Sequence, residues 1–141
     1  MLKNIPPILS PDLMKTLMEM GHGDDIVLAD GNFPAASTAQ RLIRCDGHGV
    51  PELLEAMLKF FPLDTYVDRP VAVMQIVPGD PTEPTIWEQY EEILKDSGQQ
   101  HVDLDYLERF RFYERAKNAY AVVATSEKAL YANIILKKGV L

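Results

Sequence analysis

Short runs of consecutive apolar residues alternate with amphipathic helical segments along most of this chain. Such runs occur within 24–30, 41–46 and 69–80, and two more lie within 111–125 and 131–141. Strands that are continuously apolar are buried on both faces, which is typical of a mainly parallel sheet between helices. The pattern therefore predicts an α/β domain with three layers and a largely parallel central sheet.

Three helices are indicated by their end signals and by apolar residues three and four positions apart, and a short helix that leads into a strand is expected within 111–125. The first, over 10–21, has Ser10 as its N-cap, Pro11 in its first turn and Gly21 as a terminator. The other two cover 50–62 and 84–98. The predicted apolar faces contain Leu13, Met14, Leu17 and Met18; Leu53, Leu54, Met57, Leu58 and Phe61; and Ile86, Tyr90, Ile93 and Leu94.

Length and charge limit the classes of function. The 141 residues favour one domain over 1–141, and the net charge of −7 argues against a nucleic-acid partner, which would need clustered Lys and Arg. Cys45 is the single cysteine, so a reducing compartment such as the cytoplasm fits best. The N-terminal prolines interrupt any signal region, and no run reaches the roughly 18 apolar residues of a membrane span.

Polar residues cluster where predicted strands end, and ligands of open α/β sheets gather at the carboxyl ends of strands. Asp30 closes one strand, whereas His22 lies in the turn before the same strand. Five residues of strand would separate their backbones by roughly 17 Å, at about 3.3 Å per residue. If both residues belong to one site, a bend of the chain or a second subunit has to bring them together.

His22 lies between two glycines, in MGHGDD, and this is typical of a backbone bent to aim a side chain. The alternative is a histidine that donates to the last carbonyls of the preceding helix. For Asp30, an Asx turn before Gly31 is as good an interpretation as a ligand-binding role. His48 and His101 are expected at the surface, and the histidine spacing predicts no metal site.

The segment RFRFY, from Arg109 to Tyr113, alternates arginines with aromatic residues. Such a segment can stack on RNA bases, but the acidity of the chain favours a neutral sugar, whose hydroxyls take hydrogen bonds while its ring packs on aromatic faces. Tyr131 and Asn133 at the start of the last strand add a hydroxyl and an amide. Together these residues predict a polar pocket without phosphate chemistry.

The whole chain resembles the fucose mutarotase and ribose pyranase family, and in particular its L-fucose branch. The similar stretches are LSPDLMKTLMEMGHGDDIVLADGNFP, LDTYV, RFRFYERAKNAYAVVAT and YANIILKKG. The resemblance implies a three-layer α/β fold and a ring-shaped homo-oligomer, often a decamer, with the site at a subunit boundary. A neighbouring chain could then complete a pocket that His22 and Asp30 cannot form alone.

By the same resemblance, His22 is the expected proton donor and Tyr113 a catalytic or binding tyrosine. The other expected positions contact or line the substrate: Asp30, Arg109, Tyr131 and Asn133, with Asp64 and Met74 as further lining residues. The implied reaction is the interconversion of the α and β anomers of L-fucose by acid–base catalysis. It requires no cofactor or metal, because nothing is oxidised and no lasting covalent bond to the protein forms.

Ala132 departs from the pattern, because the fucose branch usually has glycine between the tyrosine and the asparagine. At YANIIL the chain resembles the ribose pyranase branch instead. D-ribose pyranase activity is therefore an alternative, and so is a sugar-binding module that does not catalyse a reaction.

Overall fold

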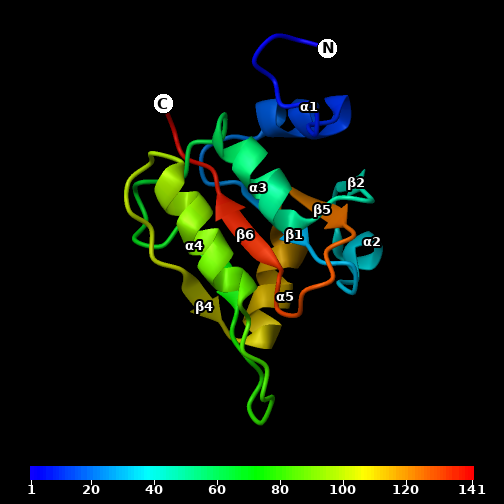
Figure 1. Cartoon of the computed structure of the whole chain (residues 1–141), viewed down its shortest axis with the longest axis vertical. Coiled ribbons are helices and arrows are strands. Elements are labelled where there is room, and N and C mark those ends of the chain that lie inside the picture. The colour runs from blue at the N-terminus through cyan, green and yellow to red at the C-terminus, as the bar shows by residue number, and fades with distance from the viewer.

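The computed structural model describes the whole chain, residues 1–141, as five helices and six strands around one mixed sheet (Figure 1). The helices are α1 (Pro11–Glu19), α2 (Ala35–Thr38), α3 (Val50–Leu58), α4 (Ile86–Asp96) and α5 (Arg109–Asn118). The strands are β1 (Asp25–Ala29), β2 (Leu42–Cys45), β3 (Val71–Met74), β4 (Asp105–Leu107), β5 (Ala121–Thr125) and β6 (Ile134–Lys137).

The sheet has the strand order β2-β5-β1-β6-β3-β4. The pairs β1–β5, β2–β5 and β3–β4 are parallel, whereas β6 is antiparallel to both of its neighbours, β1 and β3. A parallel connection needs a crossover of about a dozen residues or more, usually with a helix. Only residues 126–133 join β5 to β6, and they contain no helix, so the chain reverses direction there.

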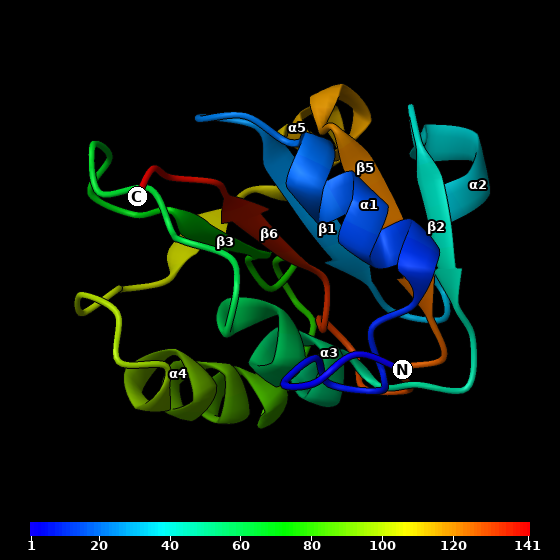
Figure 2. The same ribbon diagram turned by 90° about the horizontal axis from the view of Figure 1, so that it is seen from above.

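Helices cover both faces of the sheet, which confirms the predicted three layers. Side chains of β1 alternate between two apolar clusters: Ile26 and Leu28 face α1, α3 and α4, while Val27 and Ala29 face α2 and α5. Figure 2 shows α3 and α4 on one side of the sheet and α2 and α5 on the other. Both faces of the central strands are therefore buried, as their continuously apolar sequences indicate.

Helix α1 begins as its end signals predict and ends slightly earlier. The Ser10 hydroxyl oxygen accepts a hydrogen bond from the amide of Leu13 at 3.1 Å, and Pro11 follows the N-cap. Met20 is the C-cap residue, and Gly23 has a φ of +86°, in the left-handed region that favours glycine. The prediction that Met18 faces the core is wrong, since that residue is 81% exposed.

Two short elements have no clear sequence signal. Strand β4 has three residues with the burial pattern half-buried, exposed, buried, and helix α2 is a single turn without a side-chain cap. Both are too short to show a periodic apolar pattern. By contrast, the predicted apolar face of α3 is confirmed as buried over its length. No helix of the chain is both long enough and apolar enough to cross a membrane.

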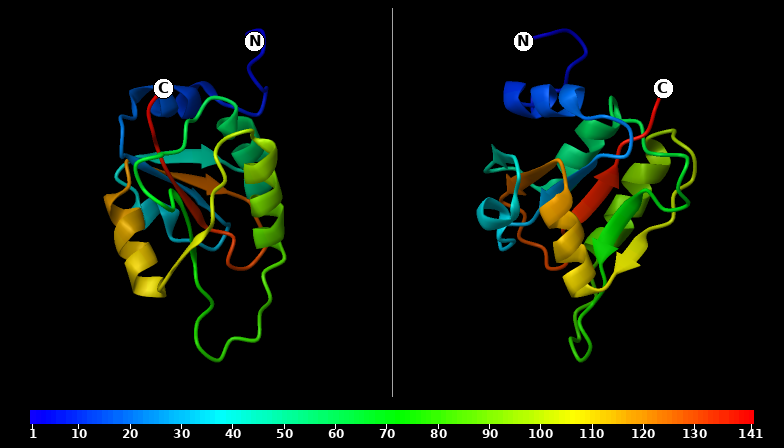
Figure 3. Two further views of the ribbon diagram at one scale, coloured as in Figure 1. Left: turned by 90° about the vertical axis from the view of Figure 1, so that its left-hand side faces the viewer. Right: turned by 180° about the vertical axis from the view of Figure 1, so that it is seen from behind.

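All strands except β6 end at the same edge of the sheet, here called the carboxyl edge. The connection between β3 and α4 projects beyond this edge as a long loop, at the bottom of Figure 1 and of both views in Figure 3. Helix α1 and both chain termini lie toward the opposite end, here called the amino edge. The two edges carry different groups of the predicted site residues.

Candidate active site

A cavity of about 400 Å³ lies at the carboxyl edge, where β1 and β3 end and β6 begins. Its volume is within the range of roughly 300–1,000 Å³ that is typical of small-molecule sites. Its lining residues are Asp30, Asn32, Phe33, Met74, Val77, Asp80, Arg109, Tyr113, Leu130, Tyr131 and Asn133. The structure thus brings together Asp30, Met74, Arg109, Tyr113, Tyr131 and Asn133 from the predicted set.

Asp30 and Asn133 join β1 to β6 at the edge of the cavity. The Asp30 amide donates to Asn133 Oδ1 at 2.8 Å, and Asp30 Oδ1 accepts from the amides of Asn32 and Phe33, each at 2.9 Å. The expected Asx turn is therefore present in a residue that also lines the cavity. Asp30 Oδ2 and Asn133 Nδ2 have no hydrogen-bond partner within the chain, so both remain available to a ligand.

The ionisation of Asp30 reflects its enclosed position. Only 8% of the residue is exposed, and burial raises the pKa of Asp30, although the amides of Asn32 and Phe33 work in the opposite direction. Glu127 adds a smaller repulsion that also raises it. A carboxylate with an elevated pKa, beside an apolar wall, is suited to accept a proton or a hydroxyl hydrogen bond.

Aromatic rings form one wall of the cavity. Phe33 and Tyr113 stack with ring centroids 5.3 Å apart and an interplanar angle of 8°, and Phe112 meets Phe33 edge-on at 6.3 Å. The Arg109 guanidinium lies 5.7 Å from the centre of the Tyr113 ring. It forms no ion pair or hydrogen bond within the chain, so its donors are free to bind oxygen atoms of a ligand.

Tyr131 has an unusual backbone conformation, with a φ of +57°. For a residue other than glycine this region costs roughly 1–2 kcal/mol. Helix α4 stabilises it: Trp87 Nε1 donates to the Tyr131 carbonyl at 2.9 Å, and the buried Tyr90 hydroxyl donates to the Ala132 carbonyl at 2.5 Å. Burial raises the pKa of Tyr90, so this hydroxyl keeps its proton.

The Ala132 methyl group does not reach the cavity. Ala132 is fully buried and belongs to the apolar cluster under α1, α3 and α4, whereas its neighbours Tyr131 and Asn133 line the cavity. The chain therefore alternates between the cavity and the core at these three residues. The departure at this position changes the core rather than the wall of the site.

His22 and Asp64 lie at the amino edge, at the other end of β1 from Asp30. His22 Nε2 is 3.1 Å from Asp64 Oδ1, and the same oxygen accepts from the Tyr66 amide at 3.0 Å. The Tyr66 amide is the main reason that the pKa of Asp64 is lowered; His22 also contributes, although burial works against both. A single chain does not bring this pair to the cavity that Asp30 lines.

The His22 ring is accessible although Asp64 is not: 43% of the His22 side chain is exposed, against 4% for Asp64. The ring also packs against Tyr66, with centroids 5.2 Å apart. A buried carboxylate thus holds one nitrogen of a ring that is partly exposed. The alternative interpretation, a histidine that donates to the carbonyls of α1, is wrong.

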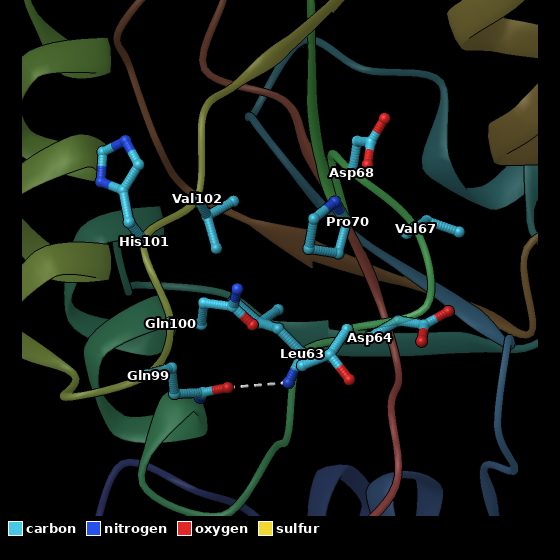
Figure 4. A pocket seen from close by; sticks show the side chains of 10 residues that line it. Leu63, Asp64, Val67, Asp68, Pro70, Gln99, Gln100, His101 and Val102 are labelled. Atoms are coloured by element: carbon cyan, nitrogen blue, oxygen red, sulfur yellow. Dashed lines mark hydrogen bonds between the residues drawn. The ribbon is translucent and has the colours of Figure 1, made fainter.

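A smaller cavity, of about 150 Å³, lies beside Asp64 (Figure 4). The side chain of Gln99, on the wall of this cavity, is hydrogen-bonded to the backbone. Gln99 Oε1 accepts from the Leu63 amide at 2.8 Å, and Gln99 Nε2 donates to the Phe61 carbonyl at 2.9 Å. His101, also on the wall, is an exposed residue, as expected. Gln99 thus holds the loop after α3 in place.

Sequence reasoning missed Asp80, which lies in the loop between β3 and α4 and lines the cavity. Asp80 Oδ2 accepts a hydrogen bond from the Tyr131 hydroxyl at 2.5 Å. The signal that could have found it is the sequence VPGD, which is typical of a tight turn at the end of a strand. Phe33 and Leu130 were also missed, and neither has a sequence signal of its own.

Comparison with known proteins agrees with this geometry. The sequence matches the RbsD / FucU transport protein family over residues 3–141. It is 56% identical to the fucose mutarotase of Homo sapiens over 146 aligned positions, which cover 99% of this chain and 94% of the human protein.

Solved structures are similar over the same length. The fucose mutarotase of Streptococcus pneumoniae, in complex with L-fucose, is 57% identical with a TM-score of 0.95, over 99% of both chains. RbsD of Bacillus subtilis, complexed with D-ribose, is 24% identical with a TM-score of 0.75, over 100% of this chain and 99% of that one, and it shares the fold. This chain belongs to the RbsD / FucU family.

Proposed function

We propose that this protein is an L-fucose mutarotase, which interconverts the α and β anomers of the sugar. The observation that carries the proposal is the cavity at the carboxyl edge, where unpartnered polar atoms of Asp30, Arg109 and Asn133 lie beside an aromatic wall. This combination suits a neutral ring with several hydroxyl groups. The similar protein of Streptococcus pneumoniae is described in complex with L-fucose.

Anomer exchange requires two proton transfers. The anomeric hydroxyl loses a proton as the bond from C1 to the ring oxygen breaks, and the ring oxygen gains one; closure on the other face of the carbonyl reverses both. One or two positioned acid–base groups, each worth roughly 10²–10⁴-fold, are sufficient for a reaction that also proceeds in water. Neither step requires a metal or an organic cofactor.

His22 is the proposed proton donor, because a histidine ordinarily titrates near pH 6.5 and can give up a proton at neutral pH. Arg109 and Asn133 orient the sugar hydroxyls, and Asp30 accepts a hydrogen bond from one of them. Tyr113 and Met74 provide apolar surface against the ring. Tyr131 is the proposed contact of the reacting hydroxyl.

The distance between the two edges supports assembly of the site from two chains. His22 of one protomer, held by Asp64, would reach the carboxyl-edge cavity of its partner. Such a contact is compatible with a closed ring in which each protomer contributes both halves, and we propose a decamer. The single cysteine, Cys45, is free and buried, which suits the cytoplasm.

The test is a measurement of anomer exchange by NMR magnetisation transfer, with L-fucose and D-ribose side by side. We expect exchange of L-fucose to exceed that of D-ribose by at least about tenfold, or 1.4 kcal/mol. Faster exchange of ribose would instead identify a pyranase. Binding of fucose with no acceleration of exchange would identify a sugar-binding module and overturn the proposal.

A further inference from the structure

Both ends of one tight turn form hydrogen bonds to the hydroxyl of Tyr131. Residues Val77 to Asp80 form this turn, which closes through the Asp80 amide donating to the Val77 carbonyl at 3.0 Å. Pro78 and Gly79 occupy its centre, and Gly79 has a φ of +87°, as the third residue of a type II turn requires. The turn therefore has a defined geometry although it lies in a projecting loop.

Both ends of the turn bond to the same oxygen atom. The Tyr131 hydroxyl donates to Asp80 Oδ2 at 2.5 Å and accepts from the Val77 amide at 3.2 Å. A phenol has one hydrogen to donate and two lone pairs that accept. With the hydrogen and one lone pair engaged, the oxygen retains a single accepting position for a ligand.

The other oxygen of Asp80 is also occupied. Asp80 Oδ1 accepts from the amide of Thr82 at 2.9 Å and from its hydroxyl at 2.6 Å. The Thr82 hydroxyl, followed by the Tyr131 hydroxyl and the Thr82 amide, lowers the pKa of Asp80, so the side chain is a carboxylate at neutral pH. The hydrogen of the Tyr131 hydroxyl is consequently bonded to Asp80 Oδ2 and is not offered to a ligand.

We propose that Asp80 is a positioning residue that presents Tyr131 to the sugar as a hydrogen-bond acceptor and takes up the phenol proton during ring opening. This inference rests on the proposed function and extends it to Asp80, a residue outside the Tyr131–Asn133 segment. The sugar hydroxyl that faces Tyr131 is then the donor.

The proton transfers balance within this arrangement. The anomeric hydroxyl passes its proton to the Tyr131 oxygen, while the Tyr131 proton moves to Asp80 Oδ2. The electrons of the broken O–H bond form the carbonyl at C1, the bond from C1 to the ring oxygen breaks, and the ring oxygen takes a proton from His22. Ring closure returns each proton, so Asp80 ends as a carboxylate.

The kinetic test compares Asp80→Asn with wild type in the fucose exchange assay. We expect kcat to fall about 10²-fold with KM nearly unchanged, because both carboxylate oxygens of Asp80 are already bonded within the chain and Asp80 acts on the sugar through Tyr131. The Tyr131→Phe variant should lose a similar amount, and the double variant no more than the worse single variant. Asp103→Asn is the matched control, because Asp103 is an exposed aspartate paired with the exposed His101, and its exchange rate should not change.

A titration of the phenol provides a readout that a purely structural role would not move. The hydrogen bond to Asp80 raises the pKa of Tyr131, against a smaller opposite effect of Arg109 and a hydrogen bond from Val77. In Asp80→Asn the pKa of Tyr131 should therefore fall, as measured by ultraviolet difference titration against Tyr131→Phe. This measurement does not depend on the activity of the protein.

The outcomes separate the two proposals. If the wild-type protein does not accelerate fucose exchange, the proposed function fails, while the phenol titration still reports on the coupling of Asp80 to Tyr131. If the wild type is active, exchange at the wild-type rate in Asp80→Asn overturns the inference. Multiplicative losses in the double variant, or an unchanged Tyr131 titration, overturn it as well.

Discussion

The two edges of the sheet carry complementary chemistry. The carboxyl edge has a cavity of about 400 Å³ with unpartnered polar atoms and an aromatic wall, but no histidine lines it. The amino edge has an accessible histidine, His22, fixed by the buried Asp64. Each edge thus has what the other lacks, and β1 keeps the two apart within one chain. The proposal that a second copy of the chain completes the site rests on this difference.

The largest expected effect comes from His22→Ala. Loss of the proton donor should lower kcat for L-fucose exchange by about 10²–10⁴-fold. The fold should be unchanged, since the His22 ring is partly exposed and does not cap a helix. His101→Ala is the control, because that histidine is also paired with an aspartate but its side chain is 83% exposed. Wild-type exchange in His22→Ala would remove this residue from the reaction.

Mixed oligomers test whether the two edges work together across a boundary. Arg109→Ala removes a free guanidinium from the cavity and should itself be nearly inactive. When His22→Ala and Arg109→Ala chains are unfolded together and refolded, some boundaries combine an intact cavity with an intact histidine. Recovery of activity in the mixture is the expected result. If each protein stays inactive after mixing, the site lies within one chain or in another arrangement.

The carboxylates of the two edges should respond to pH with opposite signs. The pKa of Asp64 is lowered, so its contribution to the free energy of unfolding is present above the ordinary value of about 4 and is lost as the pH falls through the lowered pKa. The pKa of Asp30 is raised, so its charged form costs stability at neutral pH, and that cost fades as the pH falls toward about 4.

Urea unfolding of Asp64→Asn and Asp30→Asn at several pH values measures this contrast. Wild type should be more stable than Asp64→Asn at neutral pH, and the gap should close in acid. At neutral pH the wild type should be no more stable than Asp30→Asn. As the pH falls, the free energy of unfolding of the wild type should rise relative to that of this variant. Parallel pH profiles for the two variants would contradict the assignment of opposite environments to the two edges.

A smaller effect is expected from Tyr90→Phe. The change leaves the Ala132 carbonyl without its donor in a fully buried position, which costs about 1–3 kcal/mol of stability. It should also loosen the Tyr131–Asn133 segment and reduce fucose exchange. Tyr106→Phe, at a tyrosine that is 44% exposed, should stay within about 0.5 kcal/mol of wild type. Equal stabilities of the two variants would show that the Tyr90 hydroxyl does not hold this segment.

The sequence could predict those parts of the structure that have local physical causes. The apolar runs of β1, β3 and β5 and the end signals of α1 have local physical causes, so their positions could be predicted. The antiparallel direction of β6 depends on a connection without a helix, and β4 has too few residues to show a period. The rule for strand ends could place Asp30 at the carboxyl edge, whereas Asn133 joins it there only because β6 is antiparallel to β1.

Other features of the site depend on contacts that have no local signal. The pairing of His22 with Asp64 joins residues far apart in the sequence, and the bond from Tyr131 to Asp80 connects the start of β6 to a projecting loop. A composition or spacing argument cannot identify such partners, since any aspartate of the chain could have filled either role. The sequence VPGD is typical of a tight turn, but it does not show which side chain the ends of that turn bind.

The smallest expected change in sugar preference follows from Ala132→Gly. A methyl group that contacts a substrate in a pocket is worth roughly 1–3 kcal/mol, or 10–200-fold in discrimination. Because the Ala132 methyl lies in the core, the ratio of fucose to ribose exchange should stay the same, while stability falls by about 1 kcal/mol from the added backbone freedom. Met74→Ala, which alters the cavity wall, is the positive control for a changed ratio. A tenfold shift in Ala132→Gly would mean that the core behind Tyr131 and Asn133 sets the shape of the cavity, and that the two faces of this segment are not independent.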